Sequence, residues 1–475
     1  MLTTLALRHL AVRRARSAVL LFGFALGVGV MIVLLSVGEA MLEQSRDVRL
    51  VGGGQVTVVP QGIDVEAMRT GAISGLFFGI DRARFLTRVW LGGGRHGDTV
   101  ATVSPVLEHK LVYLTVGGRT VAARAGGELP SRAAALGAGL DVVAGRWADS
   151  PADSAWMAPT PQQLYDQMDR FHLPARPDST WGEWHYFNVV TGPDEWWYIT
   201  YLVGGALPAG RWGGQLLVSH RRPDGGYERF AERIAPEAVT LDTTRADLAL
   251  GAHTVRQRDG RYQLHARTAG LAFDLEVTPA PRRYFPPVEL GGDDFVSGYV
   301  VPALSGTARG TLCVRGACRA LDGVRAYHDH NWGVWRDVTW EWGGGQGATF
   351  DLLYGGVRAP GVVARGGASP FFLALADSLG ARQVLRFREV RFEGSRPADG
   401  AAARAPERFA LVAVRDADTV RLRGEVLHAA ATAQQAGSFT RTFLQLRARW
   451  RLDGTLGGRP VRDEGLGFFE TFLGR

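Results

Sequence analysis

An uncharged apolar run near the N-terminus constrains this chain more than any other feature. No charged residue lies between Ser17 and Gly38, and the run includes AVLLFGFALGVGVMIVLL. A helix needs about 20 such residues to cross the hydrocarbon core of a membrane. The sequence therefore predicts one transmembrane helix at residues 17–38, preceded by a basic cytoplasmic segment at residues 1–16.

The charges on either side of this run predict its orientation. Four arginines precede the run, and no acidic residue does: Arg8, Arg13, Arg14 and Arg16. Glu39, Glu43 and Asp47 follow the run. The positive-inside rule then places the N-terminus in the cytoplasm and the bulk of the chain outside, as a single-pass protein of the inner membrane with a periplasmic body. A cleaved signal peptide is the alternative, because Gly38-Glu39-Ala40 has the small-x-small form of a cleavage site.

The N-terminal third also resembles a known membrane-protein family. The pieces that carry the resemblance are LALRHLAVRRARSAVLLFGFALGVGVMIVLLSVGEAM, VSPVLEHKLVYLTVGG and LGAGLDVVAGRW. They are similar to the first helix and early periplasmic domain of macrolide-exporter-type ABC permeases. The resemblance implies a permease-like extracytoplasmic segment at residues 39–150, with ABC permease and ATPase subunits as partners. The residues themselves predict a small α/β module, with β-rich runs GQVTVVP and KLVYLTV and a helix from Ser131 to Val143.

Beyond residue 151 the hydrophobic pattern changes to strict alternation. Leu271, Phe273, Leu275 and Val277 alternate with Ala272, Asp274 and Glu276, as in half-buried strands. Asp-Gly pairs, which favour tight hairpin turns, begin at Asp224, Asp259, Asp322, Asp399 and Asp453. The distal two thirds are therefore predicted to be antiparallel β-structure, in barrels or sandwiches.

The positive charge of the chain does not indicate nucleic-acid binding. The net charge is +7, but the basic residues are dispersed. Arg447, Arg449 and Arg451 alternate with apolar residues, which predicts the solvated face of a strand. We therefore expect no nucleic-acid partner.

The two cysteines lie on either side of a predicted hairpin turn. Cys313 and Cys318 flank Arg315-Gly316 in GTLCVRGACRALDG, so they can face each other across the ladder. In an oxidising compartment this predicts a disulfide, with free buried thiols as the alternative. Two cysteines without a second pair are weak evidence for zinc.

Polar groups among tryptophans mark a candidate site in AYHDHNWGVWRDVTWEW. On a strand, Tyr327, Asp329 and Asn331 share one face, and His328, His330 and Trp332 share the other. A carboxyl group surrounded by aromatic rings retains its proton more readily, which would suit Asp329 as a general acid. The structural alternative is a strand-end carboxylate bonded to backbone amides. The His-x-His pair is compatible with a metal or with hydrogen bonding, and we predict no metal and no cofactor.

The same region carries a second resemblance. Its pieces are DRFHLPARPDSTWGEWHYFNV, YHDHNWG, WEW, DLLYGGVR and GLGFFETF. They resemble the hydroxyneurosporene synthase (carotenoid 1,2-hydratase) family, which includes the secreted component of attachment-type ABC transport systems and is related to fungal lipocalin-like Diels-Alderases. The resemblance implies two lipocalin-like β-barrels, at residues 151–333 and 334–475, with an apolar ligand pocket at or near their junction. It also implies that Asp329 is the essential acid and that Tyr327 acts beside it. Tyr299 in SGYVVPALSG would supply an aromatic ring to the ligand site from the preceding strand.

These observations leave three functions open. The first is an acid-catalysed alkene hydratase or cyclase acting on an isoprenoid or similar lipid, with aromatic rings stabilising the cation. The second is a non-catalytic lipid carrier or accessory subunit of an ABC exporter, and the third is a structural remnant of a permease without a ligand pocket. The residues predicted to contact the ligand are Trp184, Tyr186, Tyr299, His328, His330, Asn331, Trp332 and Trp335.

Overall fold

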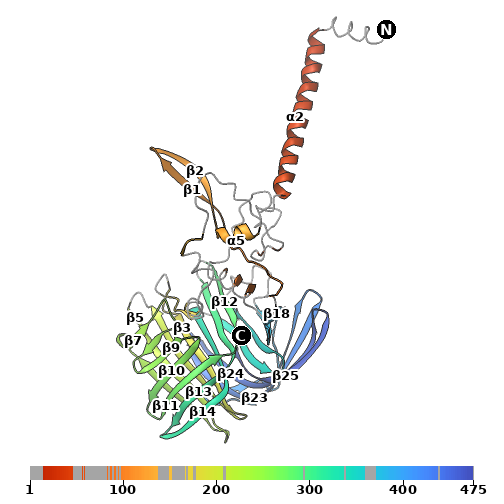
Figure 1. The fold of residues 1–475 in the computed structure, drawn as a ribbon. Coiled ribbons are helices and arrows are strands. Elements are labelled where there is room, and N and C mark those ends of the chain that lie inside the picture. Colours follow the sequence, from red (N-terminus) through yellow and green to blue (C-terminus); the bar gives the residue numbers. More distant parts are fainter. Residues whose placement is uncertain are drawn as a thin grey trace. The chain divides into compact units, whose positions relative to one another are not determined.

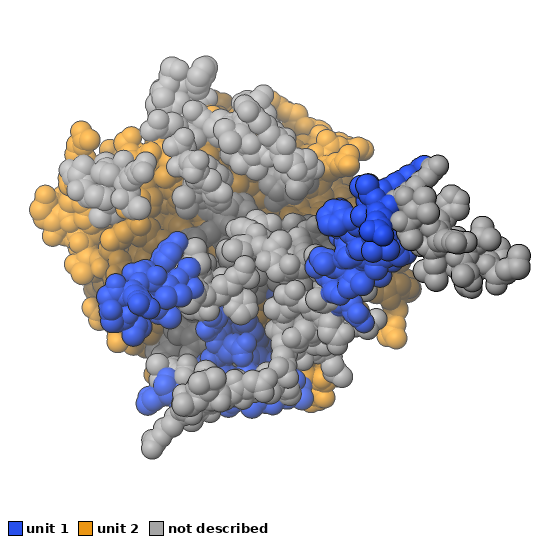
Figure 2. Space-filling view, turned by 90° about the horizontal axis from the view of Figure 1, so that it is seen from above, with its two compact units in different colours: residues 1–83, 101–156 blue, residues 84–100, 157–475 orange. Residues whose placement is uncertain are grey.

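The computed structural model describes most of the chain in two compact units, which Figure 2 colours separately. The described residues are 14–46, 99–136, 149–151, 166, 169–174, 178–206, 210–292, 295–335, 338–358, 371–436 and 439–473, with scattered residues between 56 and 98. One unit comprises residues 1–83 and 101–156, and the other comprises residues 84–100 and 157–475. Several predictions concern residues outside the described ones, including most of GQVTVVP and the distal part of the helix expected to end at Val143.

The first unit contains the predicted apolar helix. Helix α2 (Arg14–Arg46) is one continuous helix, and its stretch from Arg14 to Glu39 is long and apolar enough to cross a membrane. Its large apolar side chains are mostly exposed, for example that of Phe24 at 75%. A helix apolar on all sides needs an apolar environment, which a membrane anchor and a signal sequence both have.

The first unit also contains a two-stranded hairpin and a short helix. Strands β1 (Val106–Val116) and β2 (Arg119–Glu128) are antiparallel, and the turn between them uses two glycines with positive φ, Gly117 and Gly118. Helix α5 (Pro130–Ala135) follows, with proline in its first turn. This agrees with the predicted mixture of strands and helix in the segment before residue 150.

The second unit is almost entirely antiparallel β-structure, and its first sheet forms a nearly closed barrel (Figure 1). The strands run in the spatial order β6-β5-β4-β3-β14-β13-β11-β10-β9-β8-β7, with β12 paired to β13. Their bounds are β3 (Trp181–Gly192), β4 (Glu195–Ala206), β5 (Arg211–Arg221), β6 (Tyr227–Ile234), β7 (Val239–Leu241), β8 (Leu248–Leu250), β9 (His253–Arg258), β10 (Arg261–Thr268), β11 (Leu271–Pro279), β12 (Phe285–Gly292), β13 (Phe295–Val314) and β14 (Ala317–Val334). The two end strands β6 and β7 are joined only by the 3-10 turn η3 (Pro236–Ala238).

The second sheet closes into a ring of eight strands. Pairing of β18 with β22 completes the order β18-β17-β16-β15-β25-β24-β23-β22, and β19 pairs with β22. The bounds are β15 (Thr339–Gly347), β16 (Asp351–Arg358), β17 (Phe371–Asp377), β18 (Gly380–Phe387), β19 (Arg391–Glu393), β22 (Arg408–Arg415), β23 (Asp418–Ala436), β24 (Phe439–Leu456) and β25 (Arg459–Leu473). A separate pair, β20 (Arg396–Pro397) and β21 (Arg404–Ala405), lies between β19 and β22 in the chain. These two sheets confirm the prediction of tandem antiparallel barrels.

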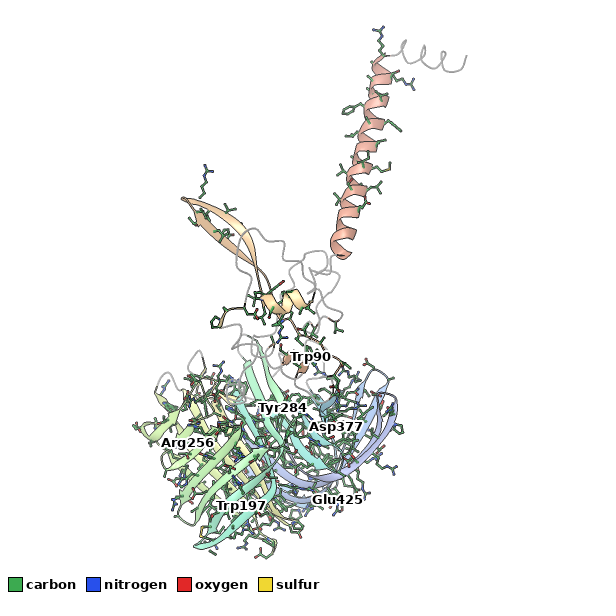
Figure 3. The ribbon with its side chains drawn as sticks, viewed as in Figure 1. Trp90, Trp197, Arg256, Tyr284, Asp377 and Glu425 are labelled. Carbon is green, nitrogen blue, oxygen red and sulfur yellow. A yellow bond between two sulfur atoms is a disulfide. The ribbon has the colours of Figure 1, made fainter. Side chains whose placement is uncertain are left out.

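Each barrel encloses its own core, as the alternation predicts. On β11 the buried side chains are Leu271, Phe273, Leu275 and Val277, while the charged side chains between them point outward. The first core includes Trp197, which is fully enclosed and labelled in Figure 3. The second core contains Trp450, which is likewise fully buried. Burial of such large side chains removes much apolar surface from water, which favours folding.

The Asp-Gly pairs were only partly correct as turn predictions. Asp224 and Asp259 lie in hairpin turns, after β5 and β9, and Asp399 lies in the loop between β20 and β21. Asp322-Gly323 instead lies at a bulge inside β14, and Asp453-Gly454 lies inside β24, where Gly454 pairs with Val420 and Val461. The strand continues past Asp453-Gly454 because β23 and β25 pair with it on either side, and β14 takes up Asp322-Gly323 as a bulge opposite β13.

A third apolar cluster joins the two barrels and is called here the junction. Its buried members come from both sheets, and they are Tyr186, Trp196, Tyr198, Tyr299, Val301, Leu304, Tyr327, Trp342, Leu353, Phe372, Ala374, Ala376 and Phe468. The outer face of each sheet is therefore covered where it meets the other. This corrects the prediction for Arg447, which is 5% exposed at the junction, whereas Arg449 and Arg451 are exposed as predicted.

The β13–β14 hairpin ends in the predicted turn and carries a disulfide. Arg315 and Gly316 both have positive φ, and Cys313 lies directly opposite Cys318 in the ladder. A disulfide joins the two cysteines, whose Cα atoms lie 3.9 Å apart.

We expect this disulfide to be detectable in protein isolated without reductant. Mass mapping should find the peptide containing both cysteines two hydrogens lighter than its reduced form, with no alkylation before reduction. Quantitative alkylation of Cys313 and Cys318 without reductant would show free thiols instead.

Candidate active site at the barrel junction

Asp329 lies at the centre of the junction because β14 belongs to the first barrel but turns one face toward the second. On this strand Tyr327 and Asp329 point into the junction, and Asp329 is 1% exposed. Tyr186 on β3 is its direct register partner. Trp342 reaches it from β15, the first strand of the second barrel. The acid is thus held by both sheets.

Three side chains donate hydrogen bonds to the Asp329 carboxyl group. The Tyr327 hydroxyl and Trp342 Nε1 donate to Oδ2 at 2.7 and 2.9 Å, and Asn331 Nδ2 donates to Oδ1 at 2.7 Å. Trp342 Nε1 also lies 3.2 Å from the Tyr327 hydroxyl. Within the described part of the chain, side chains and not backbone amides hold this carboxyl group, which disfavours the strand-end alternative.

The surroundings of Asp329 favour its protonated form. Burial raises the pKa of this carboxyl group to about 8, and the nearby Glu470 adds to the rise. The three hydrogen bonds favour the anion but do not cancel this effect. The Tyr327 hydroxyl can either donate or accept, so it can keep its contact when Asp329 carries the proton. Asp329 therefore holds a transferable proton at neutral pH.

A second buried carboxyl group, that of Glu470 on β25, lies in the same region. It accepts hydrogen bonds from Trp340 Nε1 at 3.1 Å and from Gln445 Nε2 at 3.4 Å. Burial raises its pKa to about 7, although these hydrogen bonds favour the anion. Two neighbouring carboxyl groups with different pKa values can divide the roles of acid and base.

Aromatic rings surround both carboxyl groups. Tyr299 packs edge-to-face on Trp342 with ring centroids 5.0 Å apart, and Phe468 packs edge-to-face on Tyr327 at 4.7 Å. The predicted residues Trp184 and Trp335 pack on each other and on Trp340, the donor to Glu470. The structure therefore places these residues near the carboxyl groups: Tyr186, Tyr299, Asn331, Trp184 and Trp335.

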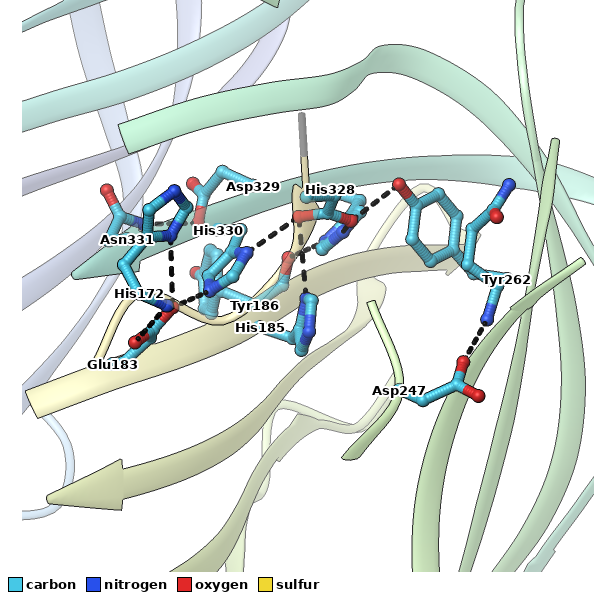
Figure 4. A network of polar contacts seen from close by, with 12 residues as sticks. His172, Glu183, His185, Tyr186, Asp247, Tyr262, His328, Asp329, His330 and Asn331 are labelled. Atoms are coloured by element: carbon cyan, nitrogen blue, oxygen red, sulfur yellow. Dashed lines mark hydrogen bonds and ion pairs between the residues drawn. The ribbon is translucent and has the colours of Figure 1, made fainter. Parts of the chain in front are cut away.

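The other face of β14 points into the first barrel, so His328, His330 and Trp332 do not reach Asp329. His330 Nδ1 lies 2.7 Å from Asp169 Oδ1, and His328 Nε2 lies 3.2 Å from Asp169 Oδ2 (Figure 4). Trp332 stacks on the His172 ring with centroids 3.7 Å apart. The two-face prediction for this strand is thus correct, and the histidine face belongs to a different site.

Asp169 and Glu183 hold the histidines of this second network. The Tyr262 hydroxyl donates to Asp169 Oδ2 at 2.6 Å, and the backbone amide of His172 donates to both oxygens of Glu183. His330 Nε2 lies 2.9 Å from Glu183 Oε1 in an ion pair. All but His172 are enclosed within the barrel.

Groups of opposite charge face each other in this network. Although burial opposes it, Asp169 and Glu183 raise the pKa of His330 to about 9. Despite its own burial, Asp169 has its pKa held well below the usual range by His185 and His328. Burial and the charge of His330 lower the pKa of His185. The arrangement is that of a buried imidazolium between two carboxylates.

By spacing alone, two sets within this network could hold a metal ion. They are Asp169, His185 and His330, and His172, Glu183 and His330, with ligand atoms within 4.8 Å of one another. A protonated His330 is a donor rather than a metal ligand. We therefore interpret the network as structural: it holds Asp169 and the adjoining Phe171 inside the first barrel.

A small cavity lies next to the candidate acid. Its volume is about 30 Å³, and Tyr327, Phe468, Asn188 and Arg447 are among its lining residues. This space holds one or two water molecules. An isoprenoid chain would have to displace junction side chains to reach Asp329.

Sequence reasoning missed three residues of these sites. Glu470 lies in the closing GLGFFETF and Trp342 in WEW, both of which carried the family resemblance without a role for these side chains. Asp169 begins DRFHLP in the same way. Their positions relative to β14 depend on pairing between distant strands, which no local pattern reports.

Comparisons with known proteins reveal similar folds only. No protein-family model matches the chain, and no curated protein does. Kievitone hydratase from Nectria haematococca is 14% identical, with a TM-score of 0.44, covering 62% of this chain and 91% of that one. CghA in complex with Sch210972 is 11% identical, with a TM-score of 0.45 and coverages of 66% and 95%. A candidate AttH from Nitrosomonas europaea is 14% identical, with a TM-score of 0.43 and coverages of 63% and 96%. These low values assign neither an activity nor a ligand to this chain.

Proposed function

We propose that this protein is an acid-catalysed alkene hydratase or cyclase that acts on an apolar isoprenoid or lipid, of the carotenoid 1,2-hydratase type. The observation that carries the proposal is the carboxyl group of Asp329, which is buried among aromatic rings, is held by Tyr327, Trp342 and Asn331, and has its pKa raised by burial. A buried acid with such a raised pKa is costly for folding, and such groups concentrate at functional sites.

The steps follow from the two carboxyl groups. Asp329 transfers its proton to one carbon of an isolated double bond, and the other carbon becomes a cation, which aromatic faces such as Tyr299 stabilise. In a hydratase, water adds to the cation and loses a proton to the Glu470 carboxylate. In a cyclase, a second double bond attacks the cation, and Glu470 removes the final proton. Glu470 then releases its proton to solvent, and Asp329 takes one back from solvent, so both carboxyl groups return to their starting states.

Deuterium transfer tests the proposal directly. The probes are squalene, geranylgeraniol and lycopene, incubated with the detergent-extracted protein in D₂O and analysed by mass spectrometry. We expect an alcohol or ring product from at least one probe, with a deuterium bound to carbon, and loss of this product in Asp329→Asn and Glu470→Gln. If all three probes are bound but returned without deuterium, the protein is a carrier and not an enzyme.

We further propose that α2 is an uncleaved anchor that keeps the barrels at the outer face of the inner membrane, next to their apolar ligand. Its length and composition support this, together with the arginines that precede it. A carrier or accessory subunit working with an ABC permease and its ATPase is the alternative, and rests on the resemblance of the N-terminal third. Lipids that co-purify with the protein would identify the cargo of such a carrier.

The anchor predicts the position of the C-terminus. Alkaline phosphatase fused after Arg475 should be active and a cytoplasmic reporter fused there inactive, because the basic flank retains the N-terminus inside. Replacing Arg13, Arg14 and Arg16 by Glu should reduce the alkaline phosphatase activity. Cytoplasmic reporter activity in the parent fusion would contradict the proposed orientation.

A further inference from the structure

Arg447 is a buried cation without a carboxylate partner among the described residues. Its side chain is 5% exposed and lies on β24 at the junction, where its guanidinium carbon is 5.4 Å from the ring centroid of Trp196. No described acid lies within ion-pair distance, and its Nε makes no hydrogen bond. The exposed arginine on the same strand, Arg451, pairs with Glu464. Burial of an unpaired charge is costly unless a ligand compensates it.

Other buried polar groups near Arg447 make no well-formed hydrogen bond. The Asn188 side chain interacts with the Tyr186 hydroxyl and the Tyr198 hydroxyl with Trp196, but neither contact has normal hydrogen-bond geometry, and Asn188 and Tyr198 are each only 3% exposed. Asn188 and Arg447 line the cavity beside Tyr327, and a second arginine, Arg325, lines it as well. Few buried polar groups in native proteins lack a well-formed hydrogen bond, so Arg447 and Asn188 at one cavity indicate a missing ligand or water.

The chemistry of these groups favours an anion. Guanidinium groups only donate, and Asn188 Nδ2 and the Tyr198 hydroxyl can donate as well. Arg325 and Arg447 repel each other across the cavity, so a cation is disfavoured there. The volume of about 30 Å³ fits the two oxygens of a carboxylate rather than a larger group.

We propose that this cavity, lined by Arg447, Asn188 and Arg325, binds the carboxylate of an apolar acid, so that the ligand of the junction is an amphipathic carboxylic acid. The inference names the ligand class for the proposed function, and it rests on that function because it requires a ligand to enter the junction. Tyr327 lines the cavity and also bonds Asp329, so the carboxylate would lie one side chain away from the acid. The arrangement would fix one end of the ligand relative to the reacting double bond.

Binding of three small probes tests the assignment without any turnover. Decanoate, decanol and acetate are titrated against the detergent-extracted protein, with the fluorescence of the junction tryptophans and equilibrium dialysis as readouts. We expect decanoate to bind about tenfold or more tightly than decanol, and acetate to bind far more weakly than decanoate. Arg447→Gln should lose about tenfold in decanoate affinity and leave decanol unchanged, whereas Arg451→Gln on the same strand should change neither.

If Arg447→Gln does not fold, Asn188→Asp replaces it in the binding test. This variant places a negative charge in the cavity, so it should weaken the binding of decanoate but not that of decanol. Its near-ultraviolet circular dichroism spectrum should match that of the parent. Equal affinity of the parent protein for decanoate and decanol would overturn the proposal, as would unchanged decanoate binding in the folded variants. Acetate binding as tight as decanoate binding would also overturn it, because the site would then take a free small anion. Selective decanoate binding without deuterium transfer would uphold this inference and reject only the proposed catalysis.

Discussion

The Asp329→Asn variant should be more stable than the parent protein at pH 9 and equally stable near pH 4. The folded protein holds the Asp329 proton up to a pKa of about 8, whereas the unfolded chain releases it near 3.8. The parent therefore loses stability as the pH rises between these two values, by about 6 kcal/mol at most. Asparagine keeps the size of the side chain and carries no charge at any pH. The measurement is the melting temperature of both proteins across this range, together with turnover, which should fall by about 10²-fold or more.

The control for this comparison is Asp416→Asn, at an exposed turn of the second barrel. Its carboxyl group is 91% exposed, so its stability difference from the parent should stay near zero at every pH. If Asp329→Asn is instead less stable than the parent by the same amount at all pH values, Asp329 is an ionised structural carboxylate. The general-acid assignment would then fail.

The Asp169→Asn variant should unfold far more easily than the parent. Asp169 accepts hydrogen bonds from Tyr262 and His330 and lies against His328, all inside the first barrel. Removing its charge leaves the His330 imidazolium with Glu183 alone in a water-free site. Breaking a buried ion pair on one side costs about 3–5 kcal/mol, which lowers the melting temperature of a domain this size by about 6–20 °C. Thermal unfolding followed by circular dichroism measures this.

The same network predicts a different outcome for metal addition. If the network is structural, zinc or cobalt should leave the melting temperature of the parent unchanged, and chelators should not destabilise it. Asp416→Asn is the control for Asp169→Asn in this experiment, and its melting temperature should respond to metal as the parent's does. Stabilisation by several degrees on adding zinc, lost in Asp169→Asn, would instead identify a metal site.

Alternation predicted the strands well because each strand's pattern depends on which face is buried. It placed Tyr327 and Asp329 on one face of β14 and His328 and His330 on the other, as observed. It could not reveal what covers a face, and for this reason Arg447 was expected in solvent. Burial of an outer face depends on the packing of one barrel against another, which is not encoded in any short window of sequence.

Turn and site residues were less predictable for related reasons. Asp259-Gly260 forms a hairpin turn, whereas Asp453-Gly454 continues a strand, although the two dipeptides are identical. The difference lies in neighbouring strands: β24 has partners on both sides from Thr442 to Gly454. Glu470 and Asp329 are far apart in sequence and meet only because β15 joins one barrel to the other.

The most direct test of Asp329 as a general acid is a measurement of its protonation state. Infrared difference spectroscopy of the parent protein against Asp329→Asn isolates the carbonyl stretch of this one carboxyl group, in H₂O and in D₂O. We expect the band of a protonated carboxyl group at pH 6. As the pH is raised, a carboxylate band should replace it with a midpoint near pH 8. A carboxylate band already present at pH 6 would contradict the general-acid assignment, because Asp329 would then have no proton to give.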